Sequence, residues 1–291
     1  MFRKTKVACW MIVNLLFSVA LPAQDSWLST PESIEAFRQQ VESTNPAESK
    51  VELASIQNTS VDLGDRSIDI RIYDPGSSEP APVLIYVHGA CWVAGSLNSH
   101  DEVSRYLAKE RGSKVIAIDY RLAPEYKYPA AHDDRLDTVQ WVWDNVEKLG
   151  IDKNRFAIGG ESAGAYFAAA TALCGIQASD SPAFSFLLLV YAALDGGGAA
   201  WPECKSQYFE NNTDARSDFT SPLWAEQLAG LPPTYNVFGQ FQISRAEQER
   251  FMRKLREQGV AGQSFMIPDV GHDIGYWLGF SGNLAAHRKA I

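Results

Sequence analysis

One short motif has the residue types of a catalytic nucleophile. Its sequence is Gly160-Glu161-Ser162-Ala163-Gly164, of the form Gly-x-Ser-x-Gly. It stands directly after an apolar run, Phe156–Gly159, and before a stretch of small residues, Ala165–Leu173. A strand before and a helix after such a motif hold the serine in a tight, strained turn that exposes its hydroxyl. The pattern therefore predicts Ser162 as a nucleophile.

A serine hydroxyl needs a base to remove its proton, and the chain has five histidines. His272 follows the last apolar run, in the polar loop Asp269–Asp273, and is the predicted base. His100 and His132 precede predicted helices, which favours capping or surface roles. His287 stands beside basic residues near the end of the chain, which favours a solvated position.

Elements that could position these residues follow from the apolar pattern. Residues Ser67–Tyr73 alternate apolar and polar side chains, as a half-buried antiparallel strand does. Six continuous apolar runs follow, mostly separated by the length of a β-α-β unit, and they predict a parallel sheet. The runs are Val83–Val87, Val115–Ile118, Phe156–Ile158, Phe186–Val190, Tyr235–Phe238 and Phe265–Ile267.

Two further segments are expected to form a cap over the sheet. Residues 31–43 predict a helix with Thr30 as N-cap and Pro31 in the first position. A long interval rich in Gly, Trp, Asn and Ser separates two of the apolar runs. We therefore predict a single α/β domain over residues 24–291, with a cap from about 25–60 and 196–228.

Donors for a developing oxyanion are expected in the loop after Val83–Val87, which reads His88-Gly89-Ala90-Cys91-Trp92. Further on stand the stretches Asp119-Tyr120-Arg121-Leu122-Ala123-Pro124-Glu125 and Tyr128-Pro129-Ala130-Ala131, then Asp134. With these motifs the chain, from Val83 to its end, resembles the hormone-sensitive-lipase-like (bacterial family IV) esterase family of the α/β-hydrolase superfamily.

The resemblance implies an α/β-hydrolase fold: a mostly parallel central sheet with an antiparallel start, helices on both faces and a small helical cap. It also implies an ester hydrolase with a Ser-His-acid triad and no cofactor. Arg121 and Glu125 would then be structural. The site residues implied are Ser162 as nucleophile, His272 as base, and the N–H groups of Ala90, Cys91 and Ala163 as oxyanion hole.

Three glycines of the family pattern are replaced in this chain. Two lie in the oxyanion loop, at Ala90 and Cys91, and the third follows the serine motif at Ala165. Each replacement adds a Cβ near the expected acyl group, so the acyl pocket should narrow. Where such a position needs a positive φ, the strain is on the order of 1 kcal/mol.

The acid position departs further from the family. Where the resemblance places a triad aspartate, this chain has Gln242. An amide cannot stabilise an imidazolium, and the corresponding change in a serine protease costs about 10⁴ in rate, so we expect impaired activity. Asp195 is the favoured substitute. Asp269 is another candidate, and the remaining carboxylates considered, Glu247 and Asp273, are expected to be solvated.

Composition limits the class of protein, and the N-terminal residues indicate its location. With 46% apolar and 21% charged residues in 291, the chain is a globular protein. Residues 1–23, with three basic residues before an apolar run, resemble a signal peptide, so we expect a secreted or periplasmic protein without a stable membrane span. The net charge of −9 argues against nucleic acid as a partner.

The cysteines indicate no metal site, because their spacings match no zinc pattern. Cys9 lies in the predicted signal peptide, which leaves Cys91, Cys174 and Cys204. Three thiols cannot all pair within one chain. A disulfide between Cys174 and Cys204 is left open.

The function expected from these residues is that of an exported serine carboxylesterase acting on a small-molecule ester, short-chain or small aryl, through an acyl-serine intermediate. Two alternatives stay open. One is a non-catalytic ligand-binding homologue that has lost the triad acid. The other is an amidase or deacetylase that uses the same residues.

Overall fold

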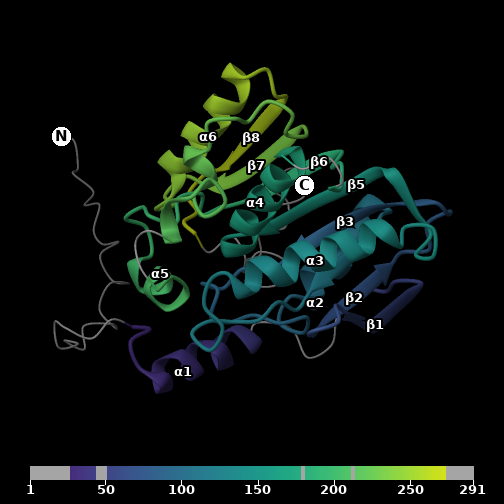
Figure 1. Ribbon diagram of the computed structural model, residues 1–291, viewed down its shortest axis with the longest axis horizontal. Helices are drawn as coiled ribbons and strands as arrows, with labels where there is room; N and C mark the ends of the chain where they lie inside the picture. Colours follow the sequence, from purple (N-terminus) through teal and green to yellow (C-terminus); the bar gives the residue numbers. More distant parts are fainter. Residues whose placement is uncertain (1–26, 44–50, 178–180, 211–213, 273–291) are drawn as a thin grey trace, which may run out of the picture.

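The strands form one eight-stranded sheet, in the order β1-β2-β4-β3-β5-β6-β7-β8 (Figure 1). The computed structural model describes residues 27–43, 51–177, 181–210 and 214–272. β2 runs antiparallel to both β1 and β4, and all other neighbours are parallel. The predicted fold is confirmed. The strands are β1 Ser55–Asp62, β2 Ser67–Asp74, β3 Ala81–Val87, β4 Lys114–Ile118, β5 Ile151–Glu161, β6 Phe186–Val190, β7 Thr234–Gly239 and β8 Gly262–Ile267.

All six apolar runs lie in strands β3 to β8, and the alternating run lies in β2. Strand β1 was not predicted, and residues 55–60 belong to the sheet and not to the cap. β1 is an edge strand whose side chains are mostly exposed, so it lacks the apolar alternation that marked β2. Its complete antiparallel pairing with β2, from Ser55 opposite Asp74 to Asp62 opposite Ser67, fixes it in place.

Two helices, α1 and α4, show the features that their sequences indicate. Thr30 caps α1 as predicted, in a reciprocal pair of hydrogen bonds with Ser33. The helix after the serine motif, α4, is buried from Ala163 to Leu173, since its small side chains pack closely against the sheet. The helices are α1 Pro31–Glu42, α2 Asp101–Arg111, α3 Ala130–Asp144, α4 Ala163–Gln177, α5 Pro202–Tyr208 and α6 Arg245–Glu257, with short 3₁₀ turns η1 Asp214–Arg216 and η2 Pro222–Trp224.

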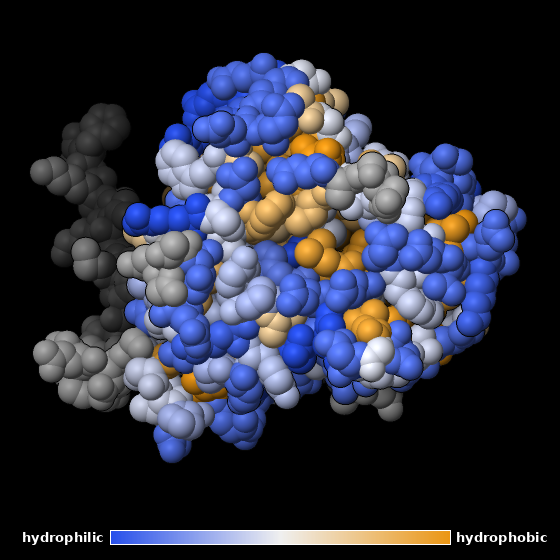
Figure 2. Space-filling model, in the orientation of Figure 1, coloured by the Kyte–Doolittle hydropathy of each residue, from blue (hydrophilic) through white to orange (hydrophobic). Residues whose placement is uncertain are grey.

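Helices α1 and α5 lie next to each other at one side of the molecule, away from the middle of the sheet (Figure 1). The amide of Gln207 in α5 donates to the carbonyl of Leu28 just before α1, at 2.9 Å. The face shown in Figure 2 is mostly hydrophilic, with hydrophobic residues gathered near the strands below α6. No helix in the described ranges is long and apolar enough to cross a bilayer. The predicted signal peptide lies outside those ranges.

A buried carboxylate holds the Asp119–Glu125 segment on the fold. Asp134 of α3 is fully buried and makes ion pairs with Arg66 at 2.7 Å and Arg121 at 2.8 Å. It also accepts the backbone N–H of Arg121 at 3.0 Å. Glu125, at the end of the segment, pairs with Arg38 of α1. Arg121 and Glu125 therefore have the structural contacts that the resemblance implied.

We expect Asp134→Asn to lower the free energy of unfolding by about 3 kcal/mol, because removing one partner of a buried ion pair leaves charge uncompensated. Asp137→Asn is the matched control. Its carboxylate also contacts Arg66, but its side chain is 52% exposed, so we expect less than about 1 kcal/mol. Urea unfolding of both variants measures the difference, and equal losses would contradict it.

Candidate active site

Ser162 sits in a sharp turn between β5 and α4, with φ of +54°. L-residues rarely adopt this backbone conformation, and the neighbouring glycines explain how the turn is held. A Cβ at Gly160 would lie 2.2 Å from the carbonyl oxygen of Val87, and one at Gly164 only 1.9 Å from the same atom. The two glycines thus let the turn press against the end of β3, which leaves the Ser162 side chain facing outward.

His272 meets Ser162, from which it is separated by 110 residues in the sequence. Its Nε2 lies 2.9 Å from Ser162 Oγ, within hydrogen-bond distance. The ring packs edge-on against Tyr191, with centroids 4.9 Å apart, and at a tilt against Trp201, the N-cap of α5, with centroids 4.4 Å apart. Burial among these rings lowers the pKa of His272 to about 4. At neutral pH the imidazole is therefore uncharged and able to accept the serine proton.

This lowered pKa predicts the acid limb of the pH profile. The base works only when neutral, so kcat/KM for an ester should stay near its plateau well below pH 6.5 and fall to half near pH 4. Initial rates after dilution from pH 7 into each buffer measure this, with circular dichroism at the same pH values as the control for unfolding. A midpoint near 6.5 in folded protein would contradict the predicted environment of His272.

Among the described residues, no acid makes a hydrogen bond to the other ring nitrogen of His272. His272 Nδ1 is buried and has no hydrogen-bond partner in the part of the chain that the structure describes. Gln242 is also buried, donates from Nε2 to Ser244 Oγ at 2.6 Å, and leaves its Oε1 without a partner among the described residues. Phe241 N–H donates to the carbonyl of Val270 at 2.9 Å. The turn with Gln242 therefore lies against the loop that carries His272.

The proposed substitute acid, Asp195, is engaged elsewhere. It accepts hydrogen bonds from Trp224 Nε1 at 2.9 Å, the N–H of Gly197 at 3.1 Å and Ser221 Oγ at 3.3 Å. These partners belong to the insertion after β6. The described residues give Asp195 no hydrogen bond to His272, so the structure does not bring the two together.

The remaining candidate acids that the structure describes, Glu247 and Asp269, make no hydrogen bond to His272 Nδ1. Glu247 is not solvated as expected: its Oε2 accepts the N–H of Leu194 at 3.2 Å, and burial raises its pKa to about 7. Asp269 is exposed, with its own N–H bonded to Gln240 Oε1. Asp273 lies outside the described residues.

The oxyanion loop follows β3 and has an unusual backbone. Ala90, Cys91 and Trp92 have φ values of 74°, 60° and 61°. The two replaced glycines therefore occupy positions that need positive φ, at a cost of roughly 1 to 2 kcal/mol per residue. No hydrogen bond found among the described residues uses the N–H of Ala90 or Cys91. Ala163 opens α4, so its N–H has no acceptor within the helix.

Glu161, between Gly160 and the nucleophile, fastens this loop. Its Oε1 accepts the N–H of Gly89 at 2.5 Å and lies 2.9 Å from His100 Nε2, and its Oε2 accepts the hydroxyl of Tyr86. Burial acts to raise the pKa of Glu161, but these contacts, those with His100 foremost, hold it below its usual value. A carboxylate beside the nucleophile was the sequence signal for this role, and it was missed.

The roles expected of two other histidines were wrong. His100 precedes α2 but makes no side-chain cap, because its ring turns inward to Glu161. His132 lies inside α3, buried, with Nε2 2.9 Å from the hydroxyl of Tyr166. Burial lowers its pKa well below the usual value. His287 lies outside the described residues.

The cysteine pairing left open from the sequence is also wrong. Cys204 of α5 forms a disulfide with Cys91 of the oxyanion loop, and Cys174 is free. The reason is the position of α5, which brings the fully buried Cys204 within a Cα–Cα distance of 5.0 Å of Cys91.

Comparison with known proteins agrees with this geometry. A family described by the alpha/beta hydrolase fold matches residues 84–275, more than half of the chain. An arylesterase of Saccharolobus solfataricus is 31% identical over 222 residues, which are 71% of this chain and 72% of that protein. An ethyl acetate hydrolase of Pseudomonas putida is 31% identical over 226 residues, 71% of each chain.

Solved structures of esterases are similar over most of the chain. The carboxylesterase EstE1 from a metagenomic library has a TM-score of 0.82 at 27% identity, covering 91% of this chain and 97% of its own. An esterase from Pyrobaculum calidifontis has a TM-score of 0.79 at 30% identity, covering 88% and 89%. The resemblance drawn from the sequence is thereby confirmed. This chain belongs to the α/β-hydrolase family, among its hormone-sensitive-lipase-like esterases, and is a carboxylic ester hydrolase.

Proposed function

We propose that the protein is an exported serine carboxylesterase that hydrolyses short-chain or small aryl esters through an acyl-serine intermediate. The observation that carries the proposal is the 2.9 Å contact of His272 Nε2 with Ser162 Oγ, at a serine in a strained turn between strand and helix. The relatives named for ethyl acetate and aryl esters support the substrate class.

In the first half of the reaction, His272 accepts the proton of Ser162 as Oγ attacks the ester carbonyl. The negative charge that develops on the carbonyl oxygen is stabilised by the N–H groups of Ala90, Cys91 and Ala163. His272 then gives the proton to the departing alcohol, and the acyl group remains on Ser162. Water, activated in turn by His272, attacks this acyl-serine and releases the acid.

Gln242 in the acid position lowers the expected rate. An amide at position 242 supplies no negative charge to the imidazolium that forms when His272 takes the proton. The aromatic rings around His272 also disfavour the charged form, as its low pKa shows. We therefore propose an esterase whose chemical step is slow relative to an enzyme with a complete triad.

Export is proposed from residues 1–23, and a disulfide in the mature chain supports it, because such bonds persist in oxidising compartments. Expression in a bacterial host with its export machinery should give a periplasmic or extracellular protein that begins near Gln24. Retention of the intact N-terminus in the cytoplasm would contradict export.

The activity is tested with the purified protein and p-nitrophenyl acetate, p-nitrophenyl octanoate and the amide p-nitroacetanilide. We expect turnover of the acetate, and a covalent adduct on the peptide containing Ser162 after treatment with diethyl p-nitrophenyl phosphate. Cleavage of the amide as fast as the ester would instead assign an amidase on the same residues.

A second candidate is a non-catalytic ligand-binding protein, favoured by one observation: His272 Nδ1 has no hydrogen-bond partner among the described residues. It predicts saturable binding of esters without hydrolysis or adduct formation. That outcome would overturn the proposed function, whereas an adduct on Ser162 would exclude the binding protein.

A further inference from the structure

The Cys91–Cys204 disulfide joins two parts of the active site that the chain separates by 113 residues. Cys91 is one of the proposed oxyanion donors, and Cys204 lies in α5, which opens with Trp201 against the ring of His272. The crosslink therefore connects the loop that would bind the oxyanion with the helix that covers the base.

Helix α5 depends on such attachments for its position. It has seven residues, and a helix this short is not stable in water without tertiary contacts. One attachment is aromatic: the ring of Tyr208 stacks on Trp92 of the oxyanion loop, with centroids 5.3 Å apart and planes 8° from parallel. The disulfide is a covalent attachment to the same loop, so residues 91 and 92 both link this loop to α5.

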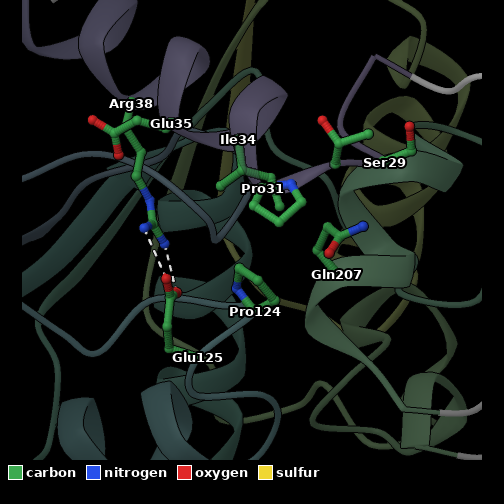
Figure 3. Close-up of a pocket in the computed structure, with 9 residues that line it drawn as sticks. Ser29, Pro31, Ile34, Glu35, Arg38, Pro124, Glu125 and Gln207 are labelled. Carbon is green, nitrogen blue, oxygen red and sulfur yellow. Dashed lines mark hydrogen bonds and ion pairs between the residues drawn. The ribbon is translucent and has the colours of Figure 1, made fainter.

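Helix α5 also borders a pocket. A pocket of about 450 Å³ lies between α1 and α5, and its lining includes Pro31, Ile34, Arg38, Pro124 and Gln207 (Figure 3). Gln207 spans from α5 toward α1 through its hydrogen bond with Leu28. Because Gln207 of α5 lines this pocket, α5 would have room to shift toward it once the disulfide is released.

The side chain of Cys91 thus points to α5. We propose that the Cys91–Cys204 disulfide positions the oxyanion donor and, through α5, holds Trp201 over His272, so that it restricts the enzyme to small esters. This inference rests on the proposed function and assigns a determinant of its substrate size.

The disulfide forms by thiol–disulfide exchange. Cys91 and Cys204 together lose two protons and two electrons, and a disulfide oxidant accepts them and is released as a dithiol. Dithiothreitol reverses the step, since it supplies two electrons and two protons and is oxidised to its own cyclic disulfide. The crosslink can therefore be removed either by mutation or by reduction of the same protein.

The test compares wild type with Cys204→Ser, and with Cys174→Ser as the matched control for loss of a thiol outside the crosslink. For Cys204→Ser we expect kcat for p-nitrophenyl acetate to fall on the order of 10-fold, less than the 10² to 10³ that follows outright removal of an oxyanion donor. The ratio of kcat/KM for the octanoate to that for the acetate should rise roughly 10-fold, because α5 can then move and admit the longer acyl chain.

Reduction provides the second arm. Dithiothreitol should add two alkylatable thiols, at Cys91 and Cys204, and convert wild type and Cys174→Ser to the behaviour of Cys204→Ser, which should not respond. An unchanged octanoate-to-acetate ratio in folded Cys204→Ser, or three free thiols in the untreated mature protein, would overturn the inference. Absence of ester turnover in the oxidised wild type would instead overturn the proposed function.

Discussion

Ser162→Ala should lower kcat for p-nitrophenyl acetate by about 10⁴ to 10⁶, the range over which loss of a triad serine removes covalent catalysis. The substitution removes Oγ, which now lies 2.9 Å from His272 Nε2, because the alanine side chain ends at Cβ. Without an acyl-serine, residual turnover depends on water and on the N–H donors alone. Steady-state rates, with the phosphate-ester adduct as a second readout, measure the loss.

The substitution leaves the turn intact, because alanine meets the same positive φ as serine does at this position. We therefore expect an unchanged melting temperature. Ser60→Ala, at an exposed position of the edge strand β1, is the control and should keep full activity. Undiminished turnover by Ser162→Ala would remove Ser162 from the mechanism.

The parts of the site that could be predicted are those encoded locally. Gly160 and Gly164 are demanded by backbone contact with Val87, so a five-residue motif is enough to reveal the turn around Ser162. His272 could be found because it follows the last strand in a polar loop. The central strands were readable since they are buried on both faces and consist of continuous apolar runs.

What could not be predicted depends on contacts between distant segments. His100 next to α2 has the sequence setting of a cap, yet Glu161 lies within 2.9 Å of its ring. Nothing in the local sequence around Cys204 distinguishes Cys91 from Cys174 as a partner, because the position of the short helix α5 decides it. Strand β1 was missed for a different reason: its outward-facing side chains give no apolar pattern at the edge of the sheet.

Gln242 is the residue at which the local sequence and the contacts between distant segments are both informative. The sequence alone marks it as an amide in the expected acid position, and the structure adds that Gln242 Oε1 and His272 Nδ1 are both buried without partners among the described residues. Two unsatisfied polar atoms on adjoining loops are costly. The His272 tautomer that leaves Nε2 free to accept from Ser162 carries its proton on Nδ1, and that N–H has no acceptor among the described residues. In the structure Gln242 therefore gives the His272 ring neither a hydrogen bond nor a negative charge.

Replacing this amide by a carboxylate should therefore raise activity. We expect Gln242→Asp, or Gln242→Glu where the longer side chain reaches better, to increase kcat about 10- to 100-fold, a partial recovery of the roughly 10⁴ lost when a triad aspartate becomes an amide. A negative charge beside His272 favours the imidazolium, so its pKa should rise from about 4 toward its ordinary value near 6.5. The acid limb of kcat/KM should then move to higher pH, since a base with a higher pKa is protonated earlier as pH falls.

Gln242→Met, similar in length and uncharged, should give neither change. If kcat and the acid limb stay as in wild type in both carboxylate variants, another group already serves His272 Nδ1, and Gln242 is not the cause of a slow chemical step.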